Sequence, residues 1–179
     1  MAHLTASVEY ALHGLLWLVD SDGSLSTREI AEIQGVSPSF LAKIFPRLEK
    51  AGIVSANDGV RGGYRLARPV DQITFLDVVD AVEGHKPLFD CQEVRERCAL
   101  FGGNPPSWAT NGTCAIHAVM IQAEKAMREV LATQTLSAVS ERFSRKAPDT
   151  YMADVREWFS DRHDRRTAGS GRPRREDTS

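Results

Sequence analysis

Apolar residues recur with a helical period in several separate stretches of the chain, and this pattern predicts a mainly α-helical fold. The first such stretch covers residues 5–19. A second helix is expected to begin at Ser26, because Ser26 and Glu29 have the spacing of a capping box. Another is expected to follow Thr74 and to run to about Glu83.

The longest helix is expected to follow Thr113, because a long apolar stripe of helical period begins there. Its members are Ile116, Val119, Met120, Ala123, Met127 and Val130. The sequence offers no other large apolar surface to cover this stripe, so a second copy of the chain is expected to pack on it. The chain is therefore expected to be a homodimer. A further short helix is expected after Pro148.

A basic stretch at residues 37–68 reads as a helix followed by a hairpin. Ser37 is a good N-cap residue, and Pro38 suits the first position of a helix. Strong turn signals at residues 57–59 and 62–63 indicate two short strands joined by a glycine-rich tip. A helix, a short turn, a second helix and then a hairpin form the outline of a winged helix-turn-helix. Double-stranded DNA is therefore the leading candidate ligand.

The second helix of such a motif lies in the major groove, with the residues near its N-terminus at base edges. The candidates for base contact are Ser37, Ser39, Phe40 and Lys43, and Arg47 is a candidate for a phosphate contact. Arginines neutralise phosphates and glycines allow a close backbone approach, so the wing adds Arg61, Gly62, Gly63, Tyr64 and Arg65. A solvated basic helix and an ordinary hairpin are the alternatives. A dimer would require an inverted-repeat operator.

Composition and charge narrow the possibilities further. The chain has 179 residues, 42% of them hydrophobic, and a formal charge of −2, so any attraction to DNA must come from local clustering of basic residues. We find no apolar run long enough to span a membrane and no signal-peptide pattern, and we expect a cytoplasmic protein. No catalytic constellation is present, and an enzyme is not expected. Residues 160–179 are polar and rich in arginine, and they are expected to be disordered.

The three cysteines, Cys91, Cys98 and Cys114, lie in or at the end of a long irregular segment, residues 85–113. An odd number of cysteines without an export signal favours metal binding or redox chemistry over a disulfide framework. Thiolates suit iron–sulfur clusters or zinc, and the helix N-terminus expected at Cys114 favours an anionic group. A cluster, a zinc ion and a thiol switch therefore all stay open.

Three segments together resemble the Rrf2 family of bacterial transcriptional regulators. They are V-R-G-G-Y-R-L-A-R after a helix ending L-E-K-A-G-I-V, the opening helix S-V-E-Y-A-L-H-G-L-L-W-L, and I-T-F-L-D-V-V-D-A-V-E-G. The likeness covers roughly residues 1–140. It implies a winged helix-turn-helix plus a long dimerisation helix, and a dimeric regulator, expected to be a repressor. The implied segments are a DNA-binding domain at 1–84, a cysteine-bearing loop at 85–113, a dimerisation helix and C-terminal helical segment at 114–159, and a disordered tail at 160–179.

The cysteine spacing separates this chain from the common pattern of the family. Gaps of six and fifteen residues replace short, even ones, and the V-E-Y-A-L-H of the opening helix is similar to the RsrR-like redox-sensing branch. That resemblance implies a 2Fe–2S rather than a 4Fe–4S cluster at the dimer interface. It assigns Glu9 and His13 of one subunit and Cys91 and Cys114 of the other as ligands, and it implies that redox or nitrosative state is sensed.

Three further residues near the expected cluster are considered as a switch or as additional ligands. The branch gives the aromatic residue at Tyr10 a role as a switch. Cys98 has no counterpart there and is expected to be a bystander. His117 lies at C-x-x-H spacing from Cys114, as in IscR-like members, and competes as a ligand. A cluster-free regulator switched by thiol oxidation or by a ligand is the main alternative, and an electron-transfer iron–sulfur protein is a more distant one.

Overall fold

The computed structural model describes residues 4–21, 23–57 and 62–169 of the chain. The helices are α1 (Ala6–Val19), α2 (Thr27–Gln34), α3 (Pro38–Lys50), α4 (Phe75–Glu83), α5 (Ser107–Thr110), α6 (Ala115–Thr133), α7 (Leu136–Ser144) and α8 (Asp149–Gly169). Short 3-10 turns are η1 (Val70–Gln72), η2 (Val94–Arg97) and η3 (Ala99–Phe101). The mainly helical fold with a small antiparallel wing is confirmed.

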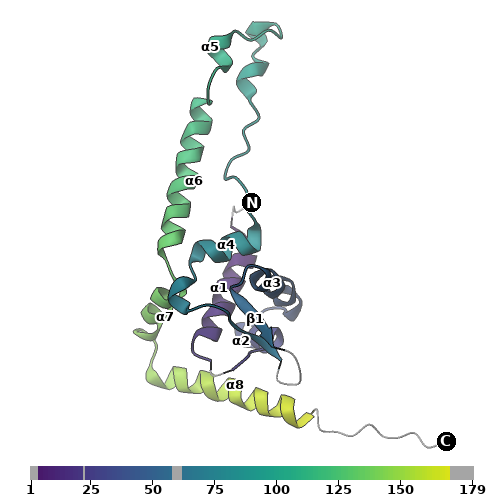
Figure 1. The fold of residues 1–179 in the computed structure, drawn as a ribbon, viewed down its shortest axis with the longest axis vertical. Helices are drawn as coiled ribbons and strands as arrows, with labels where there is room; N and C mark the ends of the chain where they lie inside the picture. The colour runs from purple at the N-terminus through teal and green to yellow at the C-terminus, as the bar shows by residue number, and fades with distance from the viewer. Residues whose placement is uncertain (1–3, 22, 58–61, 170–179) are drawn as a thin grey trace, which may run out of the picture.

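The hydrophobic core lies between α1, α2, α3 and α4 (Figure 1). Among the described residues outside 8–82, the buried apolar ones are Leu136 of α7 and Phe159 of α8. Phe45 of α3 is fully buried, and its ring packs against Gly14 of α1, where an added Cβ would lie 3.3 Å away. Large apolar side chains buried in this way supply most of the stability of a small domain.

The helix-turn-helix forms as the sequence predicts. Ser26 and Glu29 make the expected capping box at the start of α2. Gly35 ends α2 in the left-handed conformation, which favours glycine, and the chain turns directly into α3. Ser37 is the N-cap of α3, but its hydroxyl pairs with that of Ser39 at 2.8 Å rather than with the backbone.

The wing consists of β1 (Val54–Asn57) and β2 (Gly63–Leu66), paired antiparallel. Tyr64 also forms an isolated antiparallel bridge with Leu25, the residue before the capping box of α2. An added Cβ at Gly63 would lie 2.7 Å from the backbone of Leu25, so only glycine allows this approach. The wing is thus joined to the entry of the helix-turn-helix.

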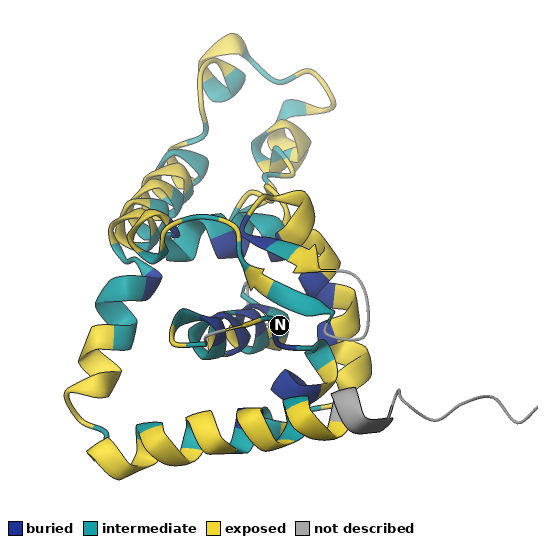
Figure 2. Cartoon of the chain, turned by 60° about the horizontal axis from the view of Figure 1, so that its bottom comes forward, coloured by how far each residue is buried: buried dark blue, intermediate teal, exposed yellow. Residues whose placement is uncertain are grey.

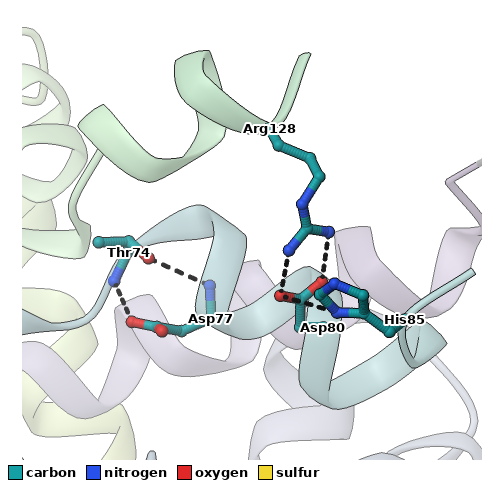
Figure 3. Close-up of polar contacts among 5 residues, drawn as sticks. All are labelled: Thr74, Asp77, Asp80, His85 and Arg128. Atoms are coloured by element: carbon teal, nitrogen blue, oxygen red, sulfur yellow. Dashed lines mark hydrogen bonds and ion pairs between the residues drawn. The ribbon is translucent and has the colours of Figure 1, made fainter. Parts of the chain in front are cut away.

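The segment that follows α4 projects away from this core. Figure 1 shows α6 rising beside the extended chain after α4, with α5 at the far end. We call residues 85–133 the arm. Its junction with the core includes an ion pair in which Arg128 donates to both carboxylate oxygens of Asp80, at 2.9 and 2.8 Å (Figure 3). His85 also lies 3.7 Å from Asp80.

The carboxyl-terminal region differs from the sequence prediction. Helix α8 has 21 residues and α6 has 19, so the prediction that α6 is the longest helix is wrong. Helix α8 continues to Gly169, so the prediction of disorder from residue 160 onward is wrong for residues 160–169. Arg162 ties this part of α8 to α2 by an ion pair with Glu32 at 2.7 Å, and it stacks 3.5 Å above the ring of Trp158, one turn earlier in α8. Sequence composition could not indicate the partner in α2. Figure 2 shows α8 as a largely exposed helix beside the core. Residues 170–179 of the expected tail lie outside the described residues.

Within the described ranges, no helix combines the length and the apolar character that crossing a bilayer requires.

Candidate nucleic-acid interface and metal centre

Helix α3 has one face buried in the core and one face exposed to solvent. Leu41, Ile44, Phe45 and Leu48 are buried in the core. The four candidates for base contact, Ser37, Ser39, Phe40 and Lys43, are all exposed. This arrangement exposes polar and cationic groups on the face that a recognition helix presents to the major groove.

Phe40 links this surface to α1. It is 49% exposed, and its ring meets that of Tyr10 edge-to-face with 5.7 Å between centroids. Tyr10 lies between Glu9 and His13 in the sequence of α1. The proposed switch residue is therefore in direct contact with the candidate recognition helix.

Arg47 has a structural contact that the sequence did not indicate. Its Nη1 donates a hydrogen bond to the Val82 carbonyl at 2.7 Å. This bond ties the carboxyl-terminal half of α3 to the last turn of α4, where carbonyl groups lack helical partners. A phosphate contact by Arg47 remains a prediction.

The wing candidates fall into three groups. Arg65 is exposed on β2, as a phosphate ligand would need to be, and Arg61 lies outside the described residues. Gly62 is half-buried beside Gly63. The ring of Tyr64 packs on Phe45 with centroids 5.0 Å apart, and burial raises the pKa of its phenol. Tyr64 therefore fastens the wing to the core, a role that the sequence did not assign to it.

The arm brings together Cys91, Glu93 and His117. One ligand atom from each lies within 4.8 Å of the other two, and each residue is half-buried. The Cys91 thiol is 3.7 Å from a Glu93 carboxylate oxygen. Thiolate, imidazole and carboxylate are all metal ligands, so this donor set fits a metal centre. Sequence reasoning missed Glu93, although its position two residues after a candidate cysteine was a usable signal.

Arg95 organises this group. Its Nε donates to Glu93 at 2.7 Å, and its Nη2 donates to the Gly112 carbonyl at 2.6 Å. The first bond holds the pKa of Glu93 below its ordinary value, with a smaller contribution from the Cys91 thiol. The pKa of Arg95 is raised chiefly by Glu93, with further contributions from Cys114 and Cys91. Both cysteines therefore lie within electrostatic reach of one guanidinium.

The backbone at Glu93 is also unusual. Its φ of 46° makes it the one non-glycine residue with positive φ in the described part of the chain. This conformation costs free energy for residues with a side chain, and such outliers concentrate at functional sites. The strained backbone thus coincides with the group of candidate ligands.

Glu9 and His13 lie apart from this group. Both are exposed on α1 at helical i, i+4 spacing, which places them on one face of the helix. Figure 1 shows the far end of the arm extending away from α1, and neither residue is a member of the group formed by Cys91, Glu93 and His117 in one chain. The ligand set implied by the resemblance therefore requires a second subunit. Cys98 precedes η3 and is not a member of the Cys91–Glu93–His117 group.

Comparisons with known proteins agree with this architecture. Protein aau3 of Rhizobium meliloti (strain 1021) is 35% identical over 135 residues, which cover 74% of this chain and 81% of that protein. The regulator IscR of Photorhabdus laumondii subsp. laumondii is 36% identical over 95 residues, or 53% of this chain and 54% of that protein. The solved structure of CymR, the global cysteine regulator of B. subtilis, matches with a TM-score of 0.62 at 24% identity, and the match covers 79% of this chain and 98% of that one.

The comparisons also identify the class of protein. The CymR match supports the fold alone, because its identity is low. The relatives are transcriptional regulators rather than enzymes, in agreement with the sequence prediction. The profile of the Rrf2 family, described as an iron-dependent transcriptional regulator, matches residues 4–142. The chain therefore belongs to the Rrf2 family of DNA-binding transcriptional regulators.

Proposed function

We propose that this regulator senses redox or nitrosative state through a 2Fe–2S cluster at a homodimer interface, and that it represses transcription from an inverted-repeat operator. The observation that carries this proposal is the convergence of Cys91, Glu93 and His117, with Arg95 bonded to Glu93, in an arm without buried residues. A 2Fe–2S cluster, when bound, would supply one-electron redox chemistry. The assignment to an RsrR-like branch is part of the proposal.

Two ligand sets are compatible with the chain. In the shared set, Glu9 and His13 of one subunit join Cys91 and Cys114 of the other. In the set within one arm, Glu93 and His117 accompany the cysteines, and the short distances among Cys91, Glu93 and His117 favour this second possibility, although Cys114 is not a member of that group. In both sets Arg95 is paired with Glu93, the neighbour of Cys91, at 2.7 Å.

Contacts of Tyr10 support a route from the shared site to DNA. Tyr10 is flanked by two of its proposed ligands and touches Phe40 of α3. A shift of α1 caused by a change in charge near Glu9 and His13 would therefore press on the recognition helix. Such a local change of charge beside a packed contact is the form that many protein switches take.

The decisive experiment is anaerobic purification with iron and sulfide analysis and a visible absorption spectrum. Cys91→Ala and Cys114→Ala should each abolish the cluster, whereas Cys98→Ala should retain it. Retention after Cys91→Ala together with loss after Cys98→Ala would contradict the cysteine assignment. Each substitution removes one thiol group and makes the same change in side-chain size, so the three variants are matched controls for one another.

Variants of the other ligands separate the two sets. In the shared set, Glu9→Ala and His13→Ala leave the cluster labile or spectrally altered, and Glu93→Ala and His117→Ala have little effect. The set within one arm predicts the reverse. A mixed dimer of His13→Ala and Cys91→Ala chains adds a further test, because a shared site is restored in one position and lost in the other.

DNA recognition is tested by selecting duplexes from a random pool, where an inverted repeat is expected. Arg65→Ala should weaken binding to all duplexes and reduce the salt slope by about one, because one phosphate contact is lost. Lys43→Ala should alter sequence preference instead. Arg97→Ala, an exposed arginine in the arm, is the control and should change neither property.

A cluster-free regulator of the same family is the second candidate. The observation that favours it is three free, half-buried cysteines, which thiol oxidation could address directly. An anaerobic protein without iron, whose affinity for DNA still changes with peroxide, would establish this candidate and overturn the cluster proposal.

A further inference from the structure

A cavity of about 530 Å³ lies between α1, α7 and α8 and the loop that leads into α2. Aromatic rings from all three helices line it: Trp17, Phe143, Tyr151 and Phe159. Cavities of this size with a mostly apolar wall and a few polar groups are typical binding sites for small molecules. We infer that this cavity binds a small aromatic anion, which acts as an effector of DNA binding.

An arginine in the cavity wall favours an anionic ligand. The lining contains one arginine, Arg156, and one carboxylate, Asp20. Arg156 makes no ion pair with any described residue. A guanidinium beside an apolar wall binds carboxylate or sulfonate groups through charge-assisted hydrogen bonds, while the rings accept a planar scaffold. His13 lines the cavity and is also a proposed cluster ligand, so the experiments below leave it unchanged.

The cavity wall is bonded to the DNA-binding elements. Ser24 accepts a hydrogen bond from Asn57 of β1 at 2.6 Å, and Leu25 exchanges two backbone hydrogen bonds with Tyr64 of β2, at 3.0 and 2.8 Å. Both strands of the wing are therefore attached to residues that would touch the ligand.

A second connection runs through α8, which forms one side of the cavity. Its Arg162 is paired with Glu32 of α2, so a displacement of α8 would be transmitted to the helix-turn-helix. A molecule between α1 and α8 that binds the free and DNA-bound forms unequally shifts the affinity for DNA, and DNA shifts the affinity for that molecule by the same factor.

Binding can be tested with two fluorescent probes that share a scaffold, the anion 8-anilinonaphthalene-1-sulfonate and the neutral N-phenyl-1-naphthylamine. We expect the sulfonate to saturate one site per chain. Arg156→Ala should weaken it about tenfold and leave the neutral probe unchanged, because a charge-assisted hydrogen bond is lost. Arg156→Lys should restore most of the affinity. Arg165→Ala, also on α8 but not in the cavity wall, is the matched control.

Blocking the cavity tests the location. Met152→Trp should fill the space and abolish binding of both probes, and Ser140→Trp, from α7, serves if the first variant melts early. Undiminished binding to a folded blocked variant would overturn the site, since the probe would then lie elsewhere, for example on the exposed apolar face of α6.

The effector role has a separate readout. Anisotropy of a labelled duplex, selected as described above, should report a change in DNA affinity of about threefold or more at saturating sulfonate probe, and none in the blocked variant. Saturable binding in the cavity without any change in DNA affinity would refute the effector role. Repeating the measurement on protein with and without iron separates this result from the cluster proposal, because His13 lines the cavity and is also a proposed cluster ligand.

Discussion

The winged-helix core and the arm are built on opposite principles. The core buries an apolar cluster from α1 to α4, including fully buried residues such as Leu15, Leu41 and Phe45. The arm has no buried residue between 85 and 133, and Ile116, Val119 and Val130 of α6 are each more than 60% exposed. The core therefore has a buried apolar cluster of its own. Since exposed apolar stripes of this size usually mark interfaces, we expect a partner to cover the arm.

The largest effect is expected in the core. Phe45→Ala removes a fully buried ring between Gly14 and Tyr64 and should cost about 3–5 kcal/mol of unfolding free energy. Leu100→Ala in the arm, where the side chain is 91% exposed, should cost almost nothing. Chemical denaturation of both variants checks the contrast. Equal losses would mean that the two regions fold as one unit.

The next largest effect concerns assembly. Val119→Glu places a carboxylate in the centre of the α6 stripe, where burial of an unpaired charge in a dimer would cost several kcal/mol. Analytical ultracentrifugation should therefore detect monomers, with the core still folded by circular dichroism. Lys125→Glu, on the opposite side of the helix, should remain dimeric. A normal dimer for Val119→Glu would exclude this face as the interface.

A smaller effect is expected from α8. Truncation after Gly169 should leave the melting temperature unchanged, whereas truncation after Ser160 removes the contacts of Arg162 with Glu32 and Trp158. An exposed ion pair and a cation–π contact are each worth at most about 1 kcal/mol, so a decrease of a few degrees is expected. Equal melting temperatures for the two truncations would show that these contacts add no stability.

The smallest effect on stability is expected from the hydrogen bonds between Thr5, before α1, and Glu83, at the end of α4. The Thr5 side chain and backbone donate hydrogen bonds to Glu83 and hold the pKa of its carboxyl below the ordinary value of 4.5. A lowered folded-state pKa means that this stabilisation is present above pH 4.5 and is lost as the pH falls through the folded value.

Glu83→Gln tests this pH dependence. The variant should be less stable than the parent by about 1 kcal/mol at neutral pH, and the difference should vanish in acid. Thermal melts over a pH series provide the measurement. A difference in stability that does not depend on pH would rule out the Glu83 carboxylate as its source.

Local signals were enough to predict the core elements. The capping box at Ser26 and Glu29, the helix start at Pro38 and the strands around the wing tip depend on neighbouring residues, and sequence spacing reports these directly. The prediction that Thr113 caps the long helix was wrong by one residue, since Cys114 is the N-cap of α6.

Long-range contacts were beyond the reach of sequence patterns. Arg47 bonds to Val82 and Arg162 bonds to Glu32 across 35 and 130 residues of chain, and no local pattern encodes such partners. Glu93 and His117 meet for the same reason: the chain folds back at the end of the arm. Ligands shared between subunits depend on a surface that one chain does not contain.

The Arg128–Asp80 pair gives the arm the mechanics of a lever. The pair lies near the base of a helix of 19 residues, whose length is about 28 Å. The far end of the helix lies about 20 Å from Arg128, so a tilt of about 5° at this fulcrum would displace it by about 1.7 Å, enough to make or break ligand contacts there. In the proposed dimer, the same geometry would turn a shift of the arm near the cysteines into a rotation of one DNA-binding core against the other.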